Sequence, residues 1–169
     1  MDVDLQATSV VDDVGVAVRR AGVRDAAGLA DLRAHMLTAM GVDVSAEPGW
    51  RAECAAHFAG RIPEVDGFAA FVVEDGGELV ASAVGWVDVH LPGVGTPAAV
   101  GYIANVSVAP AHRRLGYARA VTEAIVEWFR TDTNVRKVDL HATPEGAPLY
   151  RSMGFAPPEG EALRLRLPR

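Results

Sequence analysis

The segment VAPAHRRLGYA, residues 108–118, joins the end of an extended apolar stretch to the start of an amphipathic one. Two adjacent arginines, Arg113 and Arg114, run into Gly116 and then into helical periodicity. A helix start exposes unpaired backbone N–H groups and the positive end of the helix dipole, and glycine leaves that backbone open to a ligand. The segment therefore predicts a phosphate or pyrophosphate site. Its spacing alone fits a surface arginine pair before an ordinary helix equally well.

The segments on either side predict a mixed α/β domain. Apolar runs bounded by Gly and Pro predict strands at 14–18, 68–73, 79–91, 98–108 and 135–142, and a last extended segment from Phe155. Helical spacing predicts helices at 25–40 with Asp25 as N-cap, 48–62, 118–130 and 144–153. This order indicates a central sheet with helices on both faces. We expect residues 1–13 to be a flexible N-terminal tail and residues 14–169 to be a single domain.

Composition excludes several classes of function. The chain has 169 residues, a formal net charge of −6 and one cysteine. An acidic balance argues against general nucleic-acid binding, and one cysteine cannot form a disulfide within the chain. No histidine pair has metal-ligand spacing, so we expect no metal. Residues 1–13 do not resemble a signal peptide, and no apolar run is long enough to cross a bilayer, so we expect a cytoplasmic protein with no membrane partner.

Two segments together resemble the GNAT superfamily of acetyl-CoA-dependent N-acyltransferases. NVSVAPAHRRLGYA, residues 105–118, resembles the family's motif A, with Arg113, Gly116 and Ala118 in register with [RQ]-x-x-G-x-[GA]. LHATPEGAPLYRSMGF, residues 140–155, resembles motif B. The order of predicted elements also matches the family's fold, a mixed and mostly antiparallel sheet with helices on both faces. The resemblance implies that acetyl-CoA is the co-substrate and that an amine accepts the acetyl group.

The resemblance also implies roles for individual residues. Val106 and Val108, on either side of Ser107, would pair through their backbones with the pantetheine arm, where the strand that holds them splays from the next one. The turn after them would wrap the pyrophosphate with its amides, and Tyr150 would protonate the departing thiolate as the catalytic residue. That turn consists of Arg113, Arg114, Leu115, Gly116, Tyr117 and Ala118.

The chain departs from the family pattern at two positions. Thr143 stands where many members have an asparagine, which puts one hydrogen bond to the cofactor in question. Pro148 falls in the last predicted helix, where it is tolerated only in the first turn. An alternative function on the same fold is a non-catalytic acyl-CoA-binding regulatory module.

The sequence leaves the proton acceptor and the amine open. Asn105, His141, Asp139, Asp88 and His90 are candidates for the general base. Asp43, Glu47 and Trp50 are candidates for binding a cationic amine, although such residues are more often part of an ordinary loop. The acyl chain length and the oligomeric state also stay open, with a homodimer among the options.

Overall fold

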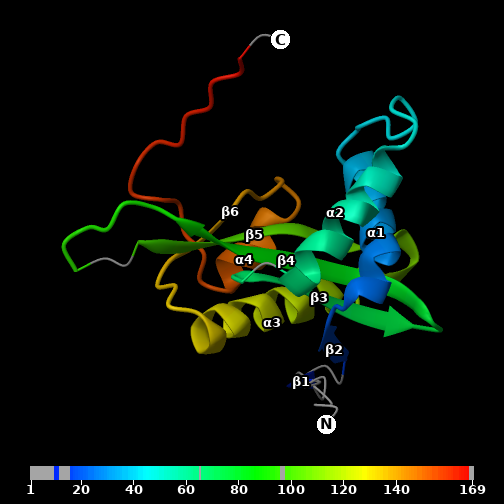
Figure 1. Ribbon diagram of the computed structural model, residues 1–169, viewed down its shortest axis with the longest axis horizontal. Helices are drawn as coiled ribbons and strands as arrows, with labels where there is room; N and C mark the ends of the chain where they lie inside the picture. Colours follow the sequence, from blue (N-terminus) through cyan, green and yellow to red (C-terminus); the bar gives the residue numbers. More distant parts are fainter. Residues whose placement is uncertain (1–9, 12–15, 65, 96–97, 168–169) are drawn as a thin grey trace.

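The computed structural model describes residues 10–11, 16–64, 66–95 and 98–167. Six strands form one sheet in the order β1-β2-β3-β4-β5-β6 (Figure 1). Neighbouring strands are antiparallel except β5 and β6, which run parallel. Their bounds are β1 Val10–Val11, β2 Ala17–Arg20, β3 Phe68–Asp75, β4 Glu78–Val89, β5 Ala99–Val108 and β6 Val138–Leu140.

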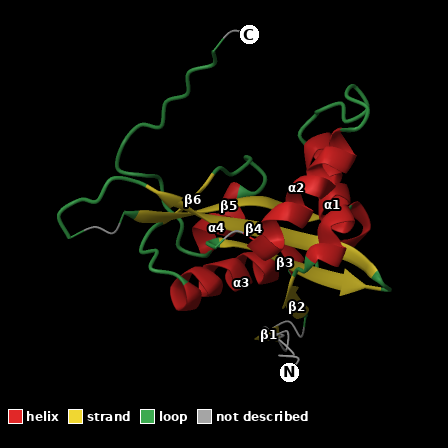
Figure 2. Ribbon diagram, in the orientation of Figure 1, coloured by secondary structure: helices red, strands yellow, loops and turns green. Residues whose placement is uncertain are grey.

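Helices cover both faces of the sheet, as the sequence predicts (Figure 2). Helices α1 (Ala26–Ala39) and α2 (Trp50–Glu64) lie on one face, where Leu29 and Phe58 pack against the alternate side chains of β3 and β4. Helix α3 (Tyr117–Asp132) lies on the other face and buries Val121, Ile125, Trp128 and Phe129 there. A short helix, α4 (Ala147–Ser152), follows β6.

Glycine in two neighbouring strands lets α3 approach the sheet closely. A Cβ added at Gly101 of β5 would lie 2.8 Å from Phe129 Cε1, and one at Gly85 of β4 would lie 2.9 Å from Ile125 Cγ2. Real Cβ atoms do not come this close to their neighbours, so α3 can occupy this position only because both residues lack a side chain.

Asp25 occupies the predicted N-cap position of α1, but its carboxylate binds elsewhere than the helix amides. It accepts hydrogen bonds of 2.7 and 2.8 Å from the Arg19 guanidinium and one of 2.7 Å from the Gly22 N–H. Arg19 also binds Glu74 at 2.7 Å. The hydrogen bond from Arg19 lowers the pKa of Asp25, which is only 6% exposed. This network fixes the start of α1 to β2 and β3.

Asp25→Asn is expected to reduce the free energy of unfolding at neutral pH by about 2 kcal/mol, since hydrogen bonds between charged, buried groups are lost. Because the folded state lowers the pKa of Asp25, its contribution is present above the ordinary aspartate pKa and disappears as the pH falls toward the folded value. Urea unfolding at neutral and acidic pH measures both effects. The matched control is Asp31→Asn, which removes an exposed ion pair with Arg51. Equal losses in the two variants would contradict the role given to Asp25.

Two strand predictions need correction. The strand expected at 135–142 is shorter, Val138–Leu140. In the segment expected as a tail, Val10–Val11 form β1, while residues 1–9, 12 and 13 lie outside the described residues, as do residues 14–15 of the strand expected at 14–18. The strand expected from Phe155 does not form: residues 155–167 contain no strand, and Leu163 and Leu165 are both 84% exposed. Pro157 and Pro158 have no N–H to donate to a ladder, and no described strand pairs with the segment.

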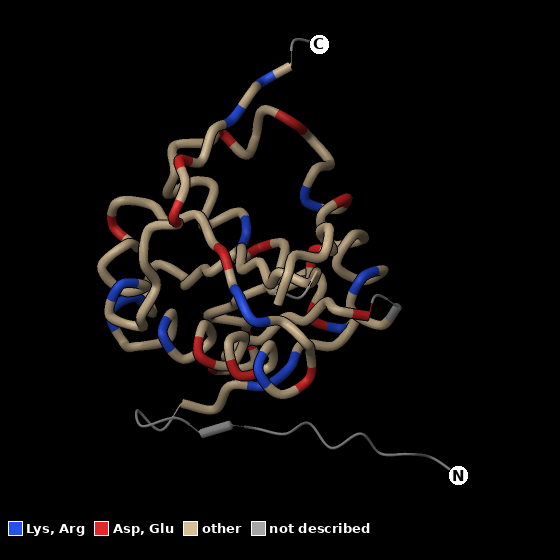
Figure 3. Tube along the Cα trace, turned by 90° about the vertical axis from the view of Figure 1, so that its left-hand side faces the viewer, with Lys and Arg blue, Asp and Glu red and all other residues tan. Residues whose placement is uncertain are grey.

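Charges of both signs are interspersed along the chain rather than separated on one face (Figure 3). On α3, for example, Arg119 pairs with Glu123 and Arg130 pairs with Glu127. Among the described residues, no helix has the length and apolar character needed to cross a membrane.

Candidate active site

The sheet splits between β5 and β6. The two strands pair over only three residue pairs, from Gly101 with Val138 to Ile103 with Leu140. Beyond Ile103, β5 continues to Val108 and pairs only with β4 within the described part of the chain. The resemblance predicts that the two strands splay apart here; in the structure β6 ends at Leu140 while β5 runs on, which leaves this edge of β5 without a partner strand in the described part of the chain.

A β-bulge lies two residues past the last β5–β6 pair. Ser82 of β4 is opposite Ser107 and Val84 is opposite Ala104, so β5 has one residue more than β4 across this interval. Asn105 lies there with a left-handed φ of +52°, a conformation that asparagine tolerates better than most residues. Ala104 shares the α1 face with Val84, and the buried Asn105 side chain also reaches α1. Two consecutive side chains thus lie on one face of the sheet.

The split edge of β5 carries the backbone amides of Val106 and Val108. Ala109 N donates to Val80 O of β4 at 2.8 Å, so this amide faces β4. Amide directions alternate along a strand, which puts the N–H groups of Val106 and Val108 on the opposite edge, where β6 has diverged. The Ser107 side chain is used elsewhere, since its hydroxyl donates to Leu32 O of α1 at 2.6 Å. A ligand in the split would therefore meet backbone donors.

The turn from Arg113 to Gly116 is exposed and leads into an uncapped helix. Arg114 and Gly116 have φ of +66° and +85°, and no side chain caps α3. Neither Arg113 nor Arg114 has an ion-pair partner among the described residues. His112 anchors the turn through a 3.3 Å contact with Asp75. The turn thus presents free guanidinium groups and free helix amides together, a combination that binds anions.

Tyr150 lies on α4, where neighbouring residues pack against its ring but no described residue forms a hydrogen bond with its hydroxyl. The ring meets Phe155 edge-on at a centroid distance of 5.9 Å and lies beside Gly146, where an added Cβ would be 3.3 Å from Tyr150 Cε2. No described residue forms a hydrogen bond with the Tyr150 hydroxyl. Burial raises the pKa of Tyr150 above its ordinary value, so the phenol stays protonated at neutral pH.

The two departures from the family pattern both belong to the start of α4. The Thr143 hydroxyl accepts a hydrogen bond of 3.2 Å from Gly146 N, so it stabilises the turn that leads into the helix. Pro148 is the second residue of α4, in the first turn, where a missing N–H has no consequence for the helix.

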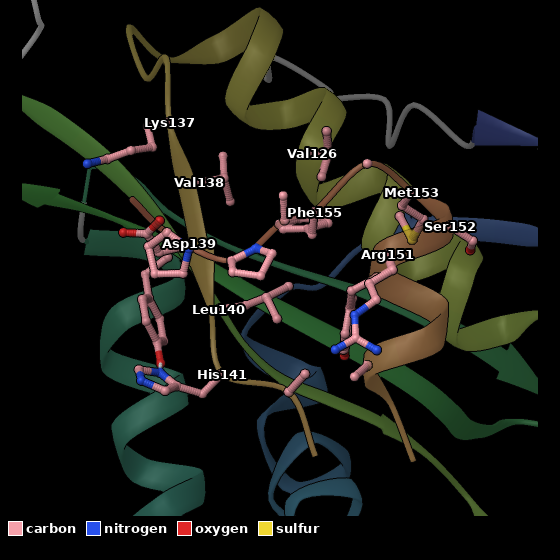
Figure 4. A pocket seen from close by; sticks show the side chains of 18 of the residues that line it. Val126, Lys137, Val138, Asp139, Leu140, His141, Arg151, Ser152, Met153 and Phe155 are labelled. Atoms are coloured by element: carbon pink, nitrogen blue, oxygen red, sulfur yellow. Dashed lines mark hydrogen bonds between the residues drawn. The ribbon is translucent and has the colours of Figure 1, made fainter. Parts of the chain in front are cut away.

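A cavity of about 1920 Å³ surrounds β6 and includes Tyr150 in its lining. Its walls come from α3, β6, α4 and the chain that follows α4 to Ala162. Figure 4 shows β6 crossing the view with Asp139 and His141 on one side, while Arg151 and Met153 lie across the cavity from them. The free edge of β6 and the first turns of α3 are therefore reached from one continuous space.

The five general-base candidates lie in three places. His141, Asp139 and Asp88 lie around Tyr102 and Trp86. Tyr102, on the α1 face of β5, hydrogen-bonds to Nδ1 of His141, and its ring packs tilted against Trp86 at a centroid distance of 4.8 Å. Asp139 is opposite Tyr102 in the ladder, and Asp88 accepts a hydrogen bond from Trp86 Nε1 at 3.0 Å. The remaining two are His90, which is exposed past the end of β4, and Asn105, which is buried at the bulge.

The residues considered for a cationic acceptor lie in the loop between α1 and α2. Trp50 Nε1 donates to Val44 O at 2.7 Å, and Asp43 accepts hydrogen bonds from the backbone and hydroxyl of Ser45. The Ser45 hydrogen bonds lower the pKa of Asp43, which therefore stays ionised. Glu47 is exposed. The loop thus engages two of the three candidates within itself.

Arg33 is a site residue that the sequence-based prediction missed. It lies on α1, one turn after the fully buried Leu29, and its Nη1 donates to Asn105 Oδ1 at 3.3 Å. Burial raises the pKa of the Cys54 thiol on α2, and the Arg33 charge opposes this rise. Asn105 is 6% exposed, and its Nδ2 has no hydrogen-bond partner among the described residues, which costs about 1–3 kcal/mol for a buried donor. The available signal in the sequence is an arginine one turn after Leu29, close to the apolar stripe of the helix.

Among the described residues, no group of three or more His, Cys, Asp or Glu side chains is arranged to hold a metal ion. The groups described above are backbone amides, the Tyr150 phenol, arginine guanidinium groups and the buried Asn105 amide.

The sequence model of the Acetyltransferase (GNAT) family matches residues 32–155 of this chain. The match spans most of the sequence and includes the split, the Arg113–Gly116 turn and α4. No protein with a curated description matches the chain.

Solved structures of acetyltransferases share the fold. A GCN5-related N-acetyltransferase from Ralstonia eutropha is 25% identical, covers 89% of this chain and 99% of its own, and has a TM-score of 0.75. A predicted acetyltransferase from Clostridium acetobutylicum, solved with acetyl-CoA, is 23% identical over 88% of this chain and 94% of its own, with a TM-score of 0.77. An aminoglycoside N-acetyltransferase in complex with CoA is 17% identical over 96% and 98%, with a TM-score of 0.67.

Proposed function

The chain belongs to the Acetyltransferase (GNAT) family, and from this premise we propose that it transfers an acetyl group from acetyl-CoA to an amine by direct attack in a ternary complex. The observation that carries the proposal is the split edge of β5. The proposal is supported by the free edge at Val106 and Val108, followed in the chain by an uncapped helix start and by two arginines without an ion-pair partner among the described residues. The amine is a small molecule or the amine of a peptide or protein. Because acetyl-CoA is kept inside cells, we expect the enzyme in the cytoplasm.

Two parts of the described chain suit two parts of acetyl-CoA, the pantetheine arm and the pyrophosphate. The Val106 and Val108 backbones would pair with the amide groups of the pantetheine arm, as a missing strand would. The turn would hold the pyrophosphate through its amides and through the guanidinium groups of Arg113 and Arg114. Gly116 permits this contact because no Cβ stands between the backbone and the ligand. When bound, acetyl-CoA supplies the acetyl group as a thioester.

Two groups of the chain would act during the transfer. The Val106 N–H would donate to the carbonyl oxygen as negative charge develops there, a contribution on the order of 3 kcal/mol in comparable sites. The Tyr150 hydroxyl would protonate the departing thiolate. Its pKa, raised by burial, keeps the proton in place at neutral pH, and its free hydroxyl has no competing partner among the described residues.

Activity is expected to rise toward alkaline pH, by about tenfold per pH unit below the pKa of the amine, because only a neutral amine attacks. Burial raises the Tyr150 pKa, so the loss of its proton limits the rate only above the ordinary tyrosine value near 10. An amine panel that follows CoA release from acetyl-CoA across about pH 6 to 9 measures this profile. Primary and secondary amines should react in preference to matched alcohols.

A kcat/KM for the amine that stays flat across that range would contradict the requirement for a neutral amine. Tight CoA binding without CoA release from acetyl-CoA, for every amine tried, would favour the non-catalytic acyl-CoA-binding module instead.

A further inference from the structure

The Arg33 guanidinium is a partly buried positive charge without a carboxylate partner among the described residues. Arg19, by comparison, contacts Asp25 and Glu74, and Arg51 contacts Asp31. For Arg33 the described residues supply one hydrogen bond, to the neutral Asn105 side chain at 3.3 Å. A guanidinium has five N–H donors, so most of its donors are left for water or a ligand.

Asn105 adds a second unused donor at the same place. Its Oδ1 accepts the hydrogen bond from Arg33, which leaves Nδ2 as the free end of the amide. This nitrogen is buried and has no partner in the described part of the chain, although buried polar groups in folded proteins are nearly always paired. The residue also has a left-handed backbone at a bulge, a conformation that persists where surrounding structure or function requires it. The cluster therefore combines one positive charge with N–H donors and lacks a matching anion.

The chemistry of this pair defines the ligand group that it fits. A guanidinium and an adjacent amide N–H bind a planar anion with two oxygen atoms, because each oxygen can accept its own hydrogen bond. One positive charge balances one negative charge, which is the charge of a carboxylate. The pyrophosphate of the co-substrate has its own site at the Arg113–Gly116 turn.

The position of the pair relates it to the acceptor. Asn105 directly precedes Val106, whose amide faces the split, and Arg33 contacts it from α1, on the opposite face of the sheet from α3. We propose that Arg33 and Asn105 bind a carboxylate of the acceptor, so that the amines acetylated at this site are amino acids or other amino carboxylates. This inference rests on the proposed function and specifies its substrate class.

Matched acceptor pairs test the inference. Each pair contains an amino acid and its decarboxylated amine, such as L-phenylalanine with 2-phenylethylamine and L-leucine with isopentylamine. Rates are compared at equal concentrations of neutral amine, since loss of the carboxylate raises the amine pKa. The wild-type enzyme is expected to prefer the amino acid by about tenfold or more in kcat/KM. Arg33→Gln should abolish this preference by raising the KM of the amino acid, with the KM of acetyl-CoA and the kcat unchanged.

Two further variants sharpen the result. Arg33→Lys keeps the charge but not the planar pair of donors, so it should retain part of the preference. Arg51→Gln removes an exposed arginine of the neighbouring helix that pairs with Asp31, and it should retain the wild-type preference. Thermal unfolding of all variants shows whether any change in KM comes from a loss of folded protein.

The ways in which the test can fail are distinguishable. A preference for the decarboxylated amines, or an equal kcat loss on both members of a pair in Arg33→Gln, would overturn the inference while leaving acetyl transfer intact. Absence of CoA release with every amine would overturn the proposed function. In that case calorimetry of L-phenylalanine binding to the CoA-bound protein decides about the carboxylate site, and identical binding by wild type and Arg33→Gln would overturn it as well.

Discussion

Replacing Tyr150 with phenylalanine is expected to lower kcat by about 100-fold or more, the usual scale for a positioned proton donor. The change deletes one hydroxyl and keeps the ring that packs against Phe155 at 5.9 Å. That hydroxyl forms no hydrogen bond with the described residues, so its loss should leave the free energy of unfolding nearly unchanged. The KM for acetyl-CoA should also change little, because the proton is needed mainly in the transition state.

A structural tyrosine would produce a different pattern from a proton donor. Loss of packing would lower the melting temperature and leave turnover near normal, so kcat and thermal unfolding measured on the same preparation separate the two roles. A further check is the leaving group: an acyl donor with a more acidic thiol needs less protonation and should be affected less by Tyr150→Phe. Normal turnover in Tyr150→Phe would show that water protonates the thiolate.

Gly116→Glu should weaken CoA binding by about 100-fold or more, which is the second large effect that we expect. A carboxylate at this position would lie at the start of α3, where the pyrophosphate is expected, and like charges in contact cost several kcal/mol. The φ of +85° adds a smaller cost, because side chains other than glycine rarely adopt it. Calorimetric titration with CoA measures the affinity, and the sheet and helices should remain intact by circular dichroism.

A matched control separates charge at the turn from backbone strain. Gly41 follows α1 with a φ of +79°, and a Cβ added there would have no neighbouring atom within 4 Å. Gly41→Glu therefore introduces the same side chain with a similar strain, in the loop between α1 and α2, which lies well apart from α3 in Figure 1. It should bind CoA as the wild-type protein does. If the two variants bind CoA equally, the phosphate assignment of the Arg113–Gly116 turn is wrong.

The fold follows from the sequence wherever local pattern and packing agree. Helix α3 is the clearest case: Val121, Ile125 and Phe129 recur at helical spacing, and all three are buried in the structure. The strand predicted from Phe155 does not form, because local pattern and packing disagree there. Its leucines alternate with arginines as in a strand, but a strand needs a neighbour with free hydrogen-bonding groups, and alternation says nothing about that neighbour. Pro157 and Pro158 also separate the segment from α4.

The residues of the candidate site also differ in whether the sequence alone can identify them. The Arg113–Gly116 turn and Tyr150 lie in short motifs, so local sequence is enough to single them out. Arg33 and Asn105 are 72 residues apart and meet only because α1 packs against β5. A single sequence contains no record of that contact. Periodicity places Arg33 close to the apolar stripe of α1, but it cannot identify the partner across the sheet.

The bulge at Asn105 has a consequence for how such a site can arise and vary. Before the bulge, Ile103 and the bare Cα of Gly101 face α3, and after it the Val106 and Val108 side chains face α3 as well. Both halves of β5 therefore keep the register of a strand that is one residue shorter. Asn105 is in effect a single-residue insertion that leaves the cores on both faces undisturbed. Natural selection could thus add, exchange or remove the residue at this position without redesigning the fold. The acceptor site that we propose at Asn105 could therefore change in evolution without a change in the stability of the sheet.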